Sequence, residues 1–411
     1  MGRDRSTHVL ARHADFRRLF IGNSVSLLGS SVTTVALPLS AVVYLHASPF
    51  QMGLLGVATL APHFVLGLPA GVWVDRLPYR RILVVADVAQ TFLVGAVPLL
   101  AWLGVLSLWQ LYVIVVLAGV ANLFENVTAQ SFTPHLVPRE QLLSANSTLM
   151  ASNATVNTTG SAVGSALVTV FAAPFALAVD AVSFAVAALF KARIGTPGPP
   201  PRATERHLAA EIAVGLRAVF TQPTVRVVIA AAALAALAGQ MQNVVLVLFL
   251  VQGLKLSSGL VGLAITVVGV AGVLSAVVAT PVTRRLGPGP AFITGMLISA
   301  LAGLVLVLAG GPLPMVLLVV ALAQVLRGAG PSLYGVNQQT LRQTLVPPDL
   351  LSRVNATWRF LVYGLQPVGA LLGGLLGSLD LRLTLIVSSA VMLLGVAVAV
   401  FSPLRSMRET P

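Results

Sequence analysis

The sequence contains no cysteine and very little charge. Without cysteine there can be no disulfide framework and no thiolate metal site. Only 9% of the 411 residues are charged, while 57% are hydrophobic. A soluble chain of this length would divide into two or three domains with much more surface charge. The composition therefore excludes an ordinary soluble protein and indicates that lipid is the solvent of most of the chain.

Motifs for catalysis and cofactor binding are also missing. No glycine-rich phosphate loop ends in Lys-Ser or Lys-Thr, so we expect no ATP hydrolysis. The six histidines lack metal-ligand spacing, and only His63 lies well inside an apolar run, where we interpret it as a packing residue. The first apolar run is too long for the core of a signal peptide. The sequence thus predicts a protein that is not an enzyme, has no metal or other cofactor, and keeps its N-terminal segment.

The net charge of +13 raises the alternative of nucleic-acid binding. That reading fails because the basic residues lie in short loops between apolar runs, not on one polar face. We expect lipid, not nucleic acid, to be the partner of this chain.

Apolar segments long enough to span a bilayer recur along the whole chain and predict an all-α integral membrane fold with twelve helices. Backbone groups in lipid must be paired within a segment, and about 20 residues cross the hydrocarbon core. The predicted spans are 19–45, 50–74, 82–105, 109–132, 141–170, 173–190, 224–251, 257–281, 290–310, 313–340, 351–378 and 382–402.

The basic residues predict the orientation in the membrane. They concentrate at the N-terminus, in every second connection and at the C-terminus, whereas the opposite connections hold only Lys255 and Arg382. By the positive-inside rule, both termini are cytoplasmic in the cell membrane. The residues assigned to the cytoplasmic side after the N-terminal segment are Arg76, Arg80, Arg81, Arg139, Lys191, Arg193, Arg202, Arg206, Arg217, Arg284, Arg285, Arg342, Arg353, Arg405 and Arg408.

Residues 191–222 form the one long break and divide the chain into a half at 1–190 and a half at 223–411. The proline-rich stretch 196–201 predicts a stiff linker. The apolar spacing over 208–219 predicts an amphipathic helix, either lying on the cytoplasmic face of the membrane or packed on loop residues as a soluble helix.

The two halves repeat each other at an offset of 209 positions. Leu136-Val137-Pro138 matches Leu345-Val346-Pro347, and Asn146 and Thr148 fall on Asn355 and Thr357. Further along, Gly160 and Gly164 fall on Gly369 and Gly373. Both copies have the same orientation, so the sequence predicts a parallel repeat of two six-helix halves.

A short charged turn lies between the second and third spans. Gly71, Asp75, Arg76, Arg80 and Arg81 stand at the spacing of the loop signature of the major facilitator superfamily, which this chain resembles. It is most similar to the branch of macrolide-efflux and siderophore-exporter proteins, through this turn, the Leu-Val-Pro-x-acid segment and Asp180-Ala181-Val182-Ser183-Phe184. In our interpretation Asp75, Arg76, Arg80 and Arg81 of this gate motif lock the cytoplasmic side, with partners at the ends of neighbouring helices, the predicted helix 351–378 among them.

Polar residues at helical spacing mark the spans that this resemblance places around a central cavity. A polar residue facing lipid is costly, so these faces point at protein or water. Taken singly, each polar residue is better explained by hydrogen bonding between helices. Taken together, they predict a cavity lined by Asn23, Ser30, Asn122, Asn126, Gln130, Asn157, Gln240, Asn243, Tyr334, Gln338, Arg359 and Tyr363.

Ionisable residues within spans need a stronger reason, since each costs roughly 2.5–3.5 kcal/mol on insertion scales. Glu125 and Arg327 are the candidates for proton coupling. The alternative for Glu125 is permanent ionisation against a basic group that the sequence does not identify. Asp87 and Asp180 lie on spans that the resemblance places at the periphery, and we interpret them as structural.

The sequence predicts a monomeric secondary transporter that exports a small, largely apolar compound in exchange for protons. An antibiotic, a siderophore or another secondary metabolite would fit. Uptake or symport is the alternative within transport. A membrane protein that carries nothing, such as a lipid scramblase or a sensor, is the alternative from another class.

Overall fold

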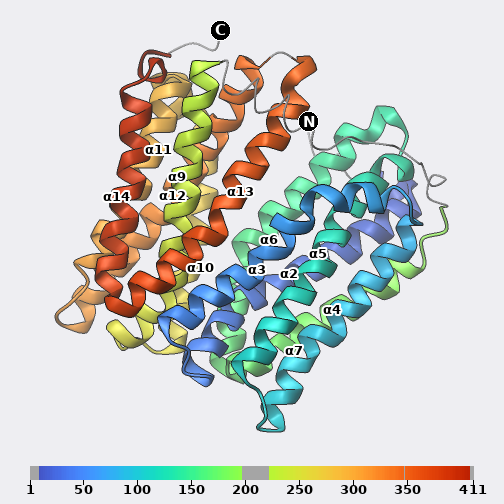
Figure 1. The fold of residues 1–411 in the computed structure, drawn as a ribbon. Helices are drawn as coiled ribbons and strands as arrows, with labels where there is room; N and C mark the ends of the chain where they lie inside the picture. Colours follow the sequence, from blue (N-terminus) through green and yellow to red (C-terminus); the bar gives the residue numbers. More distant parts are fainter. Residues whose placement is uncertain (1–8, 197–221, 347, 408–411) are drawn as a thin grey trace. The chain divides into compact units, whose positions relative to one another are not determined.

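The computed structural model describes residues 9–196, 222–346 and 348–407, and this part of the chain is helical almost throughout (Figure 1). In the first half the long helices are α2 (Ala14–Leu39), α3 (Pro49–Val74), α4 (Tyr79–Trp102), α5 (Leu108–Leu136), α6 (Leu142–Phe171) and α7 (Ala173–Ala192). In the second half they are α9 (Pro223–Leu248), α10 (Ser258–Leu286), α11 (Pro288–Val307), α12 (Leu313–Leu345), α13 (Pro348–Leu379) and α14 (Leu381–Val400). The short turns are η1 (Ser40–Tyr44), η2 (Arg139–Gln141), η3 (Phe249–Gly253) and η4 (Pro403–Ser406).

Eleven of these helices are long and apolar enough to cross a membrane. The exception within the described residues is α6, whose only such apolar stretch is Ala162–Phe171. Its first two-thirds are rich in Ser, Thr and Asn, which lowers its hydropathy although its 30 residues are long enough to span. The predicted all-α architecture is confirmed, and the predicted spans match the observed helices to within a few residues at most ends.

Two compact units divide the chain. One comprises residues 1–46 and 58–206, and the other comprises 47–57 and 207–411. The first turns of α3 thus belong with the second unit, where Gly53 packs against Gly374 of α13. The predicted linker at 197–221 and its amphipathic helix lie outside the described residues.

The repeat predicted from the sequence extends to the helix boundaries. α2 and α9 are both 26 residues long and start 209 positions apart, and η1 and η3 are both five-residue π-helical turns at that offset. α3 and α10, and α4 and α11, also start 209 positions apart, whereas α7 and α14 start 208 apart. The long helices of the two halves therefore follow the same order, with start offsets between 205 and 209 positions.

Packing within the units follows the same repeat. In the first unit α2 packs against α6 and α7, and in the second unit α9 packs against α13 and α14. A Cβ on Gly164 of α6 would lie 3.0 Å from the Val32 Cα of α2. A Cβ on Gly373 of α13 would lie 2.8 Å from the Met241 Cα of α9, which stands 209 positions after Val32. Glycine allows close approach of the two backbones, which is how small residues drive helix packing in lipid.

One assignment from the sequence is wrong. Lys191 was placed in the cytoplasmic connection, but it lies in the last turn of α7 and is fully buried. The apolar run before it ends at Phe190, so hydropathy alone truncated the helix too early.

Candidate functional site

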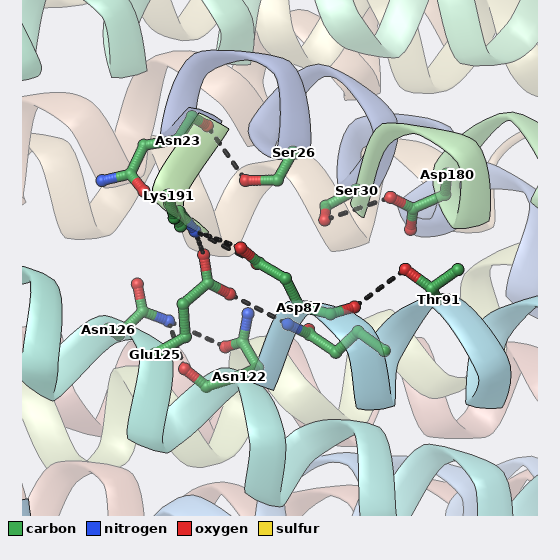
Figure 2. Close-up of polar contacts among 11 residues, drawn as sticks. Asn23, Ser26, Ser30, Asp87, Thr91, Asn122, Glu125, Asn126, Asp180 and Lys191 are labelled. Atoms are coloured by element: carbon green, nitrogen blue, oxygen red, sulfur yellow. Dashed lines mark hydrogen bonds and ion pairs between the residues drawn. The ribbon is translucent and has the colours of Figure 1, made fainter. Parts of the chain in front are cut away.

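A cluster of three charged side chains lies inside the first unit, contributed by α4, α5 and α7 (Figure 2). The ammonium nitrogen of Lys191 lies 2.6 Å from Oε1 of Glu125 and 2.9 Å from Oδ2 of Asp87. It also donates a hydrogen bond to Oδ1 of Asp87 at 3.1 Å. The amide of Gln90 donates to Oε2 of Glu125 at 2.9 Å. Lys191 thus bridges two carboxyl groups that are 38 residues apart in the sequence.

The cluster has one carboxyl group more than it has bases. The side chains of Lys191 and Asp87 are wholly buried, and that of Glu125 is 9% exposed. Two ionised carboxylates and one ammonium would leave a net negative charge in a low-dielectric interior, which is costly. A single proton shared between Asp87 and Glu125 makes the cluster neutral, so its composition suits the binding of one proton.

The local sequence explains how Lys191 reaches these acids. Asp180, Phe184, Ala187 and Lys191 follow one another at helical spacing on the buried face of α7. The lysine side chain runs past Gly22 of α2, where an added Cβ would lie 3.3 Å from its Cγ and Cε atoms. A glycine at this point leaves room for the aliphatic part of the lysine between the two helices.

A polar cavity of about 740 Å³ in the first unit lies next to the cluster. Of the predicted lining residues, it includes Asn23, Ser30, Asn122, Asn126 and Gln130. Glu125 lines it too, so the only partly exposed carboxyl of the cluster is the one at the cavity wall. The side chain of Asn157, also predicted to line a cavity, lies outside the described part of the chain.

Hydrogen bonds along the cavity hold several of these side chains. The amide of Asn126 donates to the side-chain oxygen of Asn122 at 2.8 Å. The buried side-chain oxygen of Asn23 accepts no hydrogen bond from any described residue. Apolar surface comes from Leu27, Leu149, Met150 and Phe184. The lining thus offers both hydrogen-bonding groups and apolar contacts.

Asp180 is buried near the same face but is held differently. Its carboxyl oxygens accept hydrogen bonds from the hydroxyl groups of Thr33, Ser30 and Ser183. No described basic residue pairs with it. This arrangement ties α7 to α2 and agrees with a structural interpretation of Asp180.

Arg327 lies in the second unit, half-buried on α12. It donates a hydrogen bond to the side-chain oxygen of Asn243 on α9, whose amide donates to Gln240 at 3.0 Å. Three of the predicted residues are therefore brought together in this unit. The described basic partner of Glu125 is Lys191, a residue that the sequence interpretation had placed in a loop.

The remaining predicted cavity residues of the second unit lie in two places. Tyr334 packs edge-on against Phe292, with 6.3 Å between the ring centroids, and Phe292 belongs to a buried apolar cluster. Gln338 is buried on α12. On α13, Arg359 is exposed. The ring of Tyr363 lies edge-on to that of Trp358, with 5.6 Å between the ring centroids.

Among the described residues of the second unit, no charged cluster stands at the equivalent positions. Through the repeat, Asp87 and Glu125 correspond to Met296 and Tyr334 at the offset of 209, and Lys191 corresponds to Ala399 at the offset of 208 that relates α7 to α14. Met296 and Ala399 belong to one buried apolar cluster, against which Tyr334 packs. The same architecture is thus built with apolar side chains in one half and with three charges in the other.

The charged turn between α3 and α4 keeps its acid close to a helix start. Asp75 follows the last residue of α3, and its carboxylate accepts a hydrogen bond from the Tyr79 hydroxyl at 3.3 Å. Arg76, Arg80 and Arg81 are exposed, and none of them pairs with an acid among the described residues. Gly71 has open space where a Cβ would point.

The comparison with known families covers nearly the whole chain. The family described as "Transmembrane secretion effector" matches residues 6–410. The multidrug efflux pump Tap of Mycolicibacterium fortuitum is 29% identical over 389 residues, which is 91% of this chain and 92% of Tap. The enterobactin exporter EntS of Escherichia coli is 26% identical over 416 residues, which is 98% of this chain and 95% of EntS. These relatives are transporters and not enzymes.

Solved structures show the same fold at lower identity. A point mutant of the nucleoside transporter NupG aligns with a TM-score of 0.78 at 12% identity, over 94% of this chain and 100% of that one. A bacterial homologue of the iron transporter ferroportin in its inward-facing state aligns with a TM-score of 0.73 at 19% identity. The alignment covers 94% of this chain and 98% of that one.

Proposed function

The chain belongs to the transmembrane secretion effector family of the major facilitator superfamily, and from that premise we propose that it exports a small organic compound in exchange for protons. The proposal includes insertion in the cell membrane with both termini cytoplasmic, and alternating access as the transport mechanism. The two halves at 1–190 and 223–411 would be the units that move.

The observation that carries the proposal is the three-membered charge cluster at the wall of the polar cavity. Burying ionic groups in a membrane protein costs free energy. In this chain the repeat-related positions of the second half hold uncharged residues. Because Met296, Tyr334 and Ala399 fill the corresponding positions, the fold does not require charges there. Replacing a buried ion pair by apolar groups is often neutral or stabilising, so the retained charges favour a functional role.

The geometry suggests how a proton is exchanged. Glu125 is the member of the cluster that reaches the cavity, while Asp87 is sealed behind it. In the proposed cycle the cluster is neutral when Glu125 carries a proton and Lys191 pairs with Asp87. When the proton leaves to the cytoplasm, the ammonium group is shared between both carboxylates, and protonation from outside restores the first arrangement.

Substrate and proton compete in this scheme. Asn23, Asn122 and Asn126 offer hydrogen bonds within the same cavity as Glu125, so a bound compound lies near the carboxyl that loses the proton. The mixture of amides with Leu27 and Phe184 supports a compound with both apolar surface and hydrogen-bonding groups. Arg327, hydrogen-bonded to Asn243 in the second unit, is the second candidate for a role in proton coupling.

An accumulation assay tests the proposed function. The chain is expressed in a bacterial strain that lacks its own exporters, and a chemical panel of antibiotics, siderophores and dyes is loaded with and without a protonophore. Lower accumulation of at least one compound, abolished by the protonophore, is the expected result. Higher accumulation of a compound on expression would indicate uptake, and no change with any compound would contradict export.

A further inference from the structure

The second unit contains a set of buried donor groups that takes no part in the proposed transport scheme. The guanidinium carbon of Arg342, in the last turn of α12, lies 4.3 Å from the ring centroid of Trp358 on α13. Trp358 packs against the apolar cluster around Val225, Ile229 and Val354. The stack fixes the orientation of both side chains.

Three nitrogen atoms at this stack, and a fourth on Gln338 one helical turn before Arg342, are buried and have no acceptor within the described chain. They are Nε and Nη1 of Arg342, Nε1 of Trp358 and Nε2 of Gln338. Gln338 lies one helical turn before Arg342, so their side chains share a face of α12. Buried donors are almost always paired, because each one left without an acceptor costs the desolvation of that group. Four orphaned donors at one place point to a missing acceptor.

The positive charge at this place also has no carboxylate partner among the residues that the structure describes. Arg359 is close enough to Arg342 for the two positive charges to act on each other. α12 contains no acidic residue, and the only one in α13 is Asp349, in its first turn. No described carboxylate pairs with either arginine.

We propose that Arg342, Trp358 and Gln338, with Arg359 beside them, form a binding site for an oxyanion of the phosphate type. A phosphate group is rich in acceptor oxygens, and the planar fork of an arginine matches two of them at once. Asn355 lies one turn before Trp358 and leaves its buried side-chain oxygen without a donor. A hydroxyl group on the same ligand would supply that donor.

Two sources can provide this chemistry. Arg342 lies in the last turn of a spanning helix, on the side that the positive-inside rule places in the cytoplasm. Basic pockets between spanning helices on that side are typical binding places for the head groups of anionic lipids. A free phosphate or phosphorylated metabolite is the other source. The site is independent of the proposed proton coupling, because neither Glu125 nor the charge cluster takes part in it.

Trp358 itself can report binding. The chain has four tryptophans, and Trp73, Trp102 and Trp109 are exposed on its surface. Replacing these three by phenylalanine leaves Trp358 as the single tryptophan of the full-length protein. Its fluorescence is then titrated with inorganic phosphate at constant ionic strength in detergent. In a second arm, the Trp358 fluorescence is compared between two kinds of phosphatidylcholine nanodisc. One kind contains no phosphatidylglycerol, and the other contains about 30 mol% of this anionic lipid. The unfolding temperature is recorded for every sample as a second readout.

We expect a saturable fluorescence change and a higher unfolding temperature in one or both arms. Arg342→Gln weakens the binding by about tenfold or more, because it removes the charged fork. Arg342→Lys keeps the charge but binds more weakly than wild type. Arg405→Gln is the matched control, since it removes an exposed arginine from η4 of the same unit, and it changes the affinity by less than about twofold.

A response confined to the phosphatidylglycerol nanodiscs assigns the site to a lipid head group, and a response confined to phosphate assigns it to a soluble anion. The proposal is overturned if the protein with Trp358 as its single tryptophan responds in neither arm. It is equally overturned if Arg405→Gln weakens binding as much as Arg342→Gln, since the effect would then be general attraction to a basic protein. Should Arg342→Gln not fold, Arg359→Gln and Gln338→Leu give the same comparison.

Discussion

The ammonium group of Lys191 lies 2.6 Å from the Glu125 carboxylate and closes a buried ion pair between α7 and α5. Asp87 on α4 shares the same ammonium at 2.9 Å. This pairing supplies the basic partner of Glu125 that the sequence does not reveal. It also makes Asp87, interpreted as structural from the sequence, a member of the cluster.

Removing the base should destabilise the first unit. Lys191→Met leaves two carboxyl groups buried without a counter-charge, which costs roughly 3–5 kcal/mol when one partner of a buried pair is lost. Thermal unfolding of the purified protein in detergent measures the effect. The triple variant Asp87→Leu, Glu125→Gln, Lys191→Met should regain most of the lost stability, because it imitates the apolar cluster of the second unit. Equal stability of the single and triple variants would contradict this explanation.

The close approach of α13 to α9 should be sensitive to a single methyl group. A Cβ on Gly369 would lie 2.4 Å from the Leu237 carbonyl oxygen, so Gly369→Ala forces two backbones apart and should cost about 1–3 kcal/mol. Gly239→Ala is the control, because a Cβ there meets nothing within 4 Å. If both variants unfold at the same temperature, the packing of these helices is not as tight as described.

The orientation in the membrane follows from the basic residues. Reporter fusions after Ser48, Ser107 and Ser257 should report the outside, and fusions after Pro78, Pro201 and Pro288 should report the cytoplasm. Four of these positions lie in the described connections between long helices, Pro288 is the first residue of α11, and Pro201 lies in the predicted linker. A reversed pattern would overturn the assignment of both termini to the cytoplasm.

The charged turn after α3 should act on a conformational step. Asp75→Asn removes a carboxylate placed next to the start of α4, where a negative charge is favourable. We expect slower transport with nearly unchanged substrate affinity, measured as the initial rate and the half-saturating concentration of uptake into inverted vesicles. Tyr79→Phe removes the hydrogen bond but keeps the carboxylate, and should leave the rate closer to normal. A normal rate for Asp75→Asn would rule out a role as a lock.

Most of the fold could be predicted from the sequence, because hydropathy and the positive-inside rule act on long segments. The repeat was also visible, since segments such as Leu136-Val137-Pro138 recur without gaps. The contact between Lys191 and Glu125 could not be found in this way. Lys191 ends an apolar run, and a base at that place is indistinguishable by hydropathy from a loop residue.

A signal for the cluster was nevertheless present. Lys191 continues the spacing of Asp180, Phe184 and Ala187 along one face of α7, and Asp87 lies early in α4, at the same end of the bundle. Tertiary packing decides which faces of α4, α5 and α7 contact one another. The periodicity along a single helix gives no information about that packing. The unpaired donors of Arg342 and Trp358 were hidden for the same reason, because α12 and α13 had to be packed before the orphaned atoms appeared.

The central claim is that Glu125 carries the proton that drives export. Glu125→Gln imitates the protonated side chain and keeps one base and one acid, Lys191 and Asp87, in the cluster. The decisive measurement is transport by purified Glu125→Gln in proteoliposomes, with and without an imposed pH gradient, for a compound identified in the accumulation assay. We predict that the pH gradient no longer accelerates or concentrates transport, while exchange of labelled for unlabelled compound continues. Transport by Glu125→Gln that the pH gradient still drives as in wild type would contradict the account.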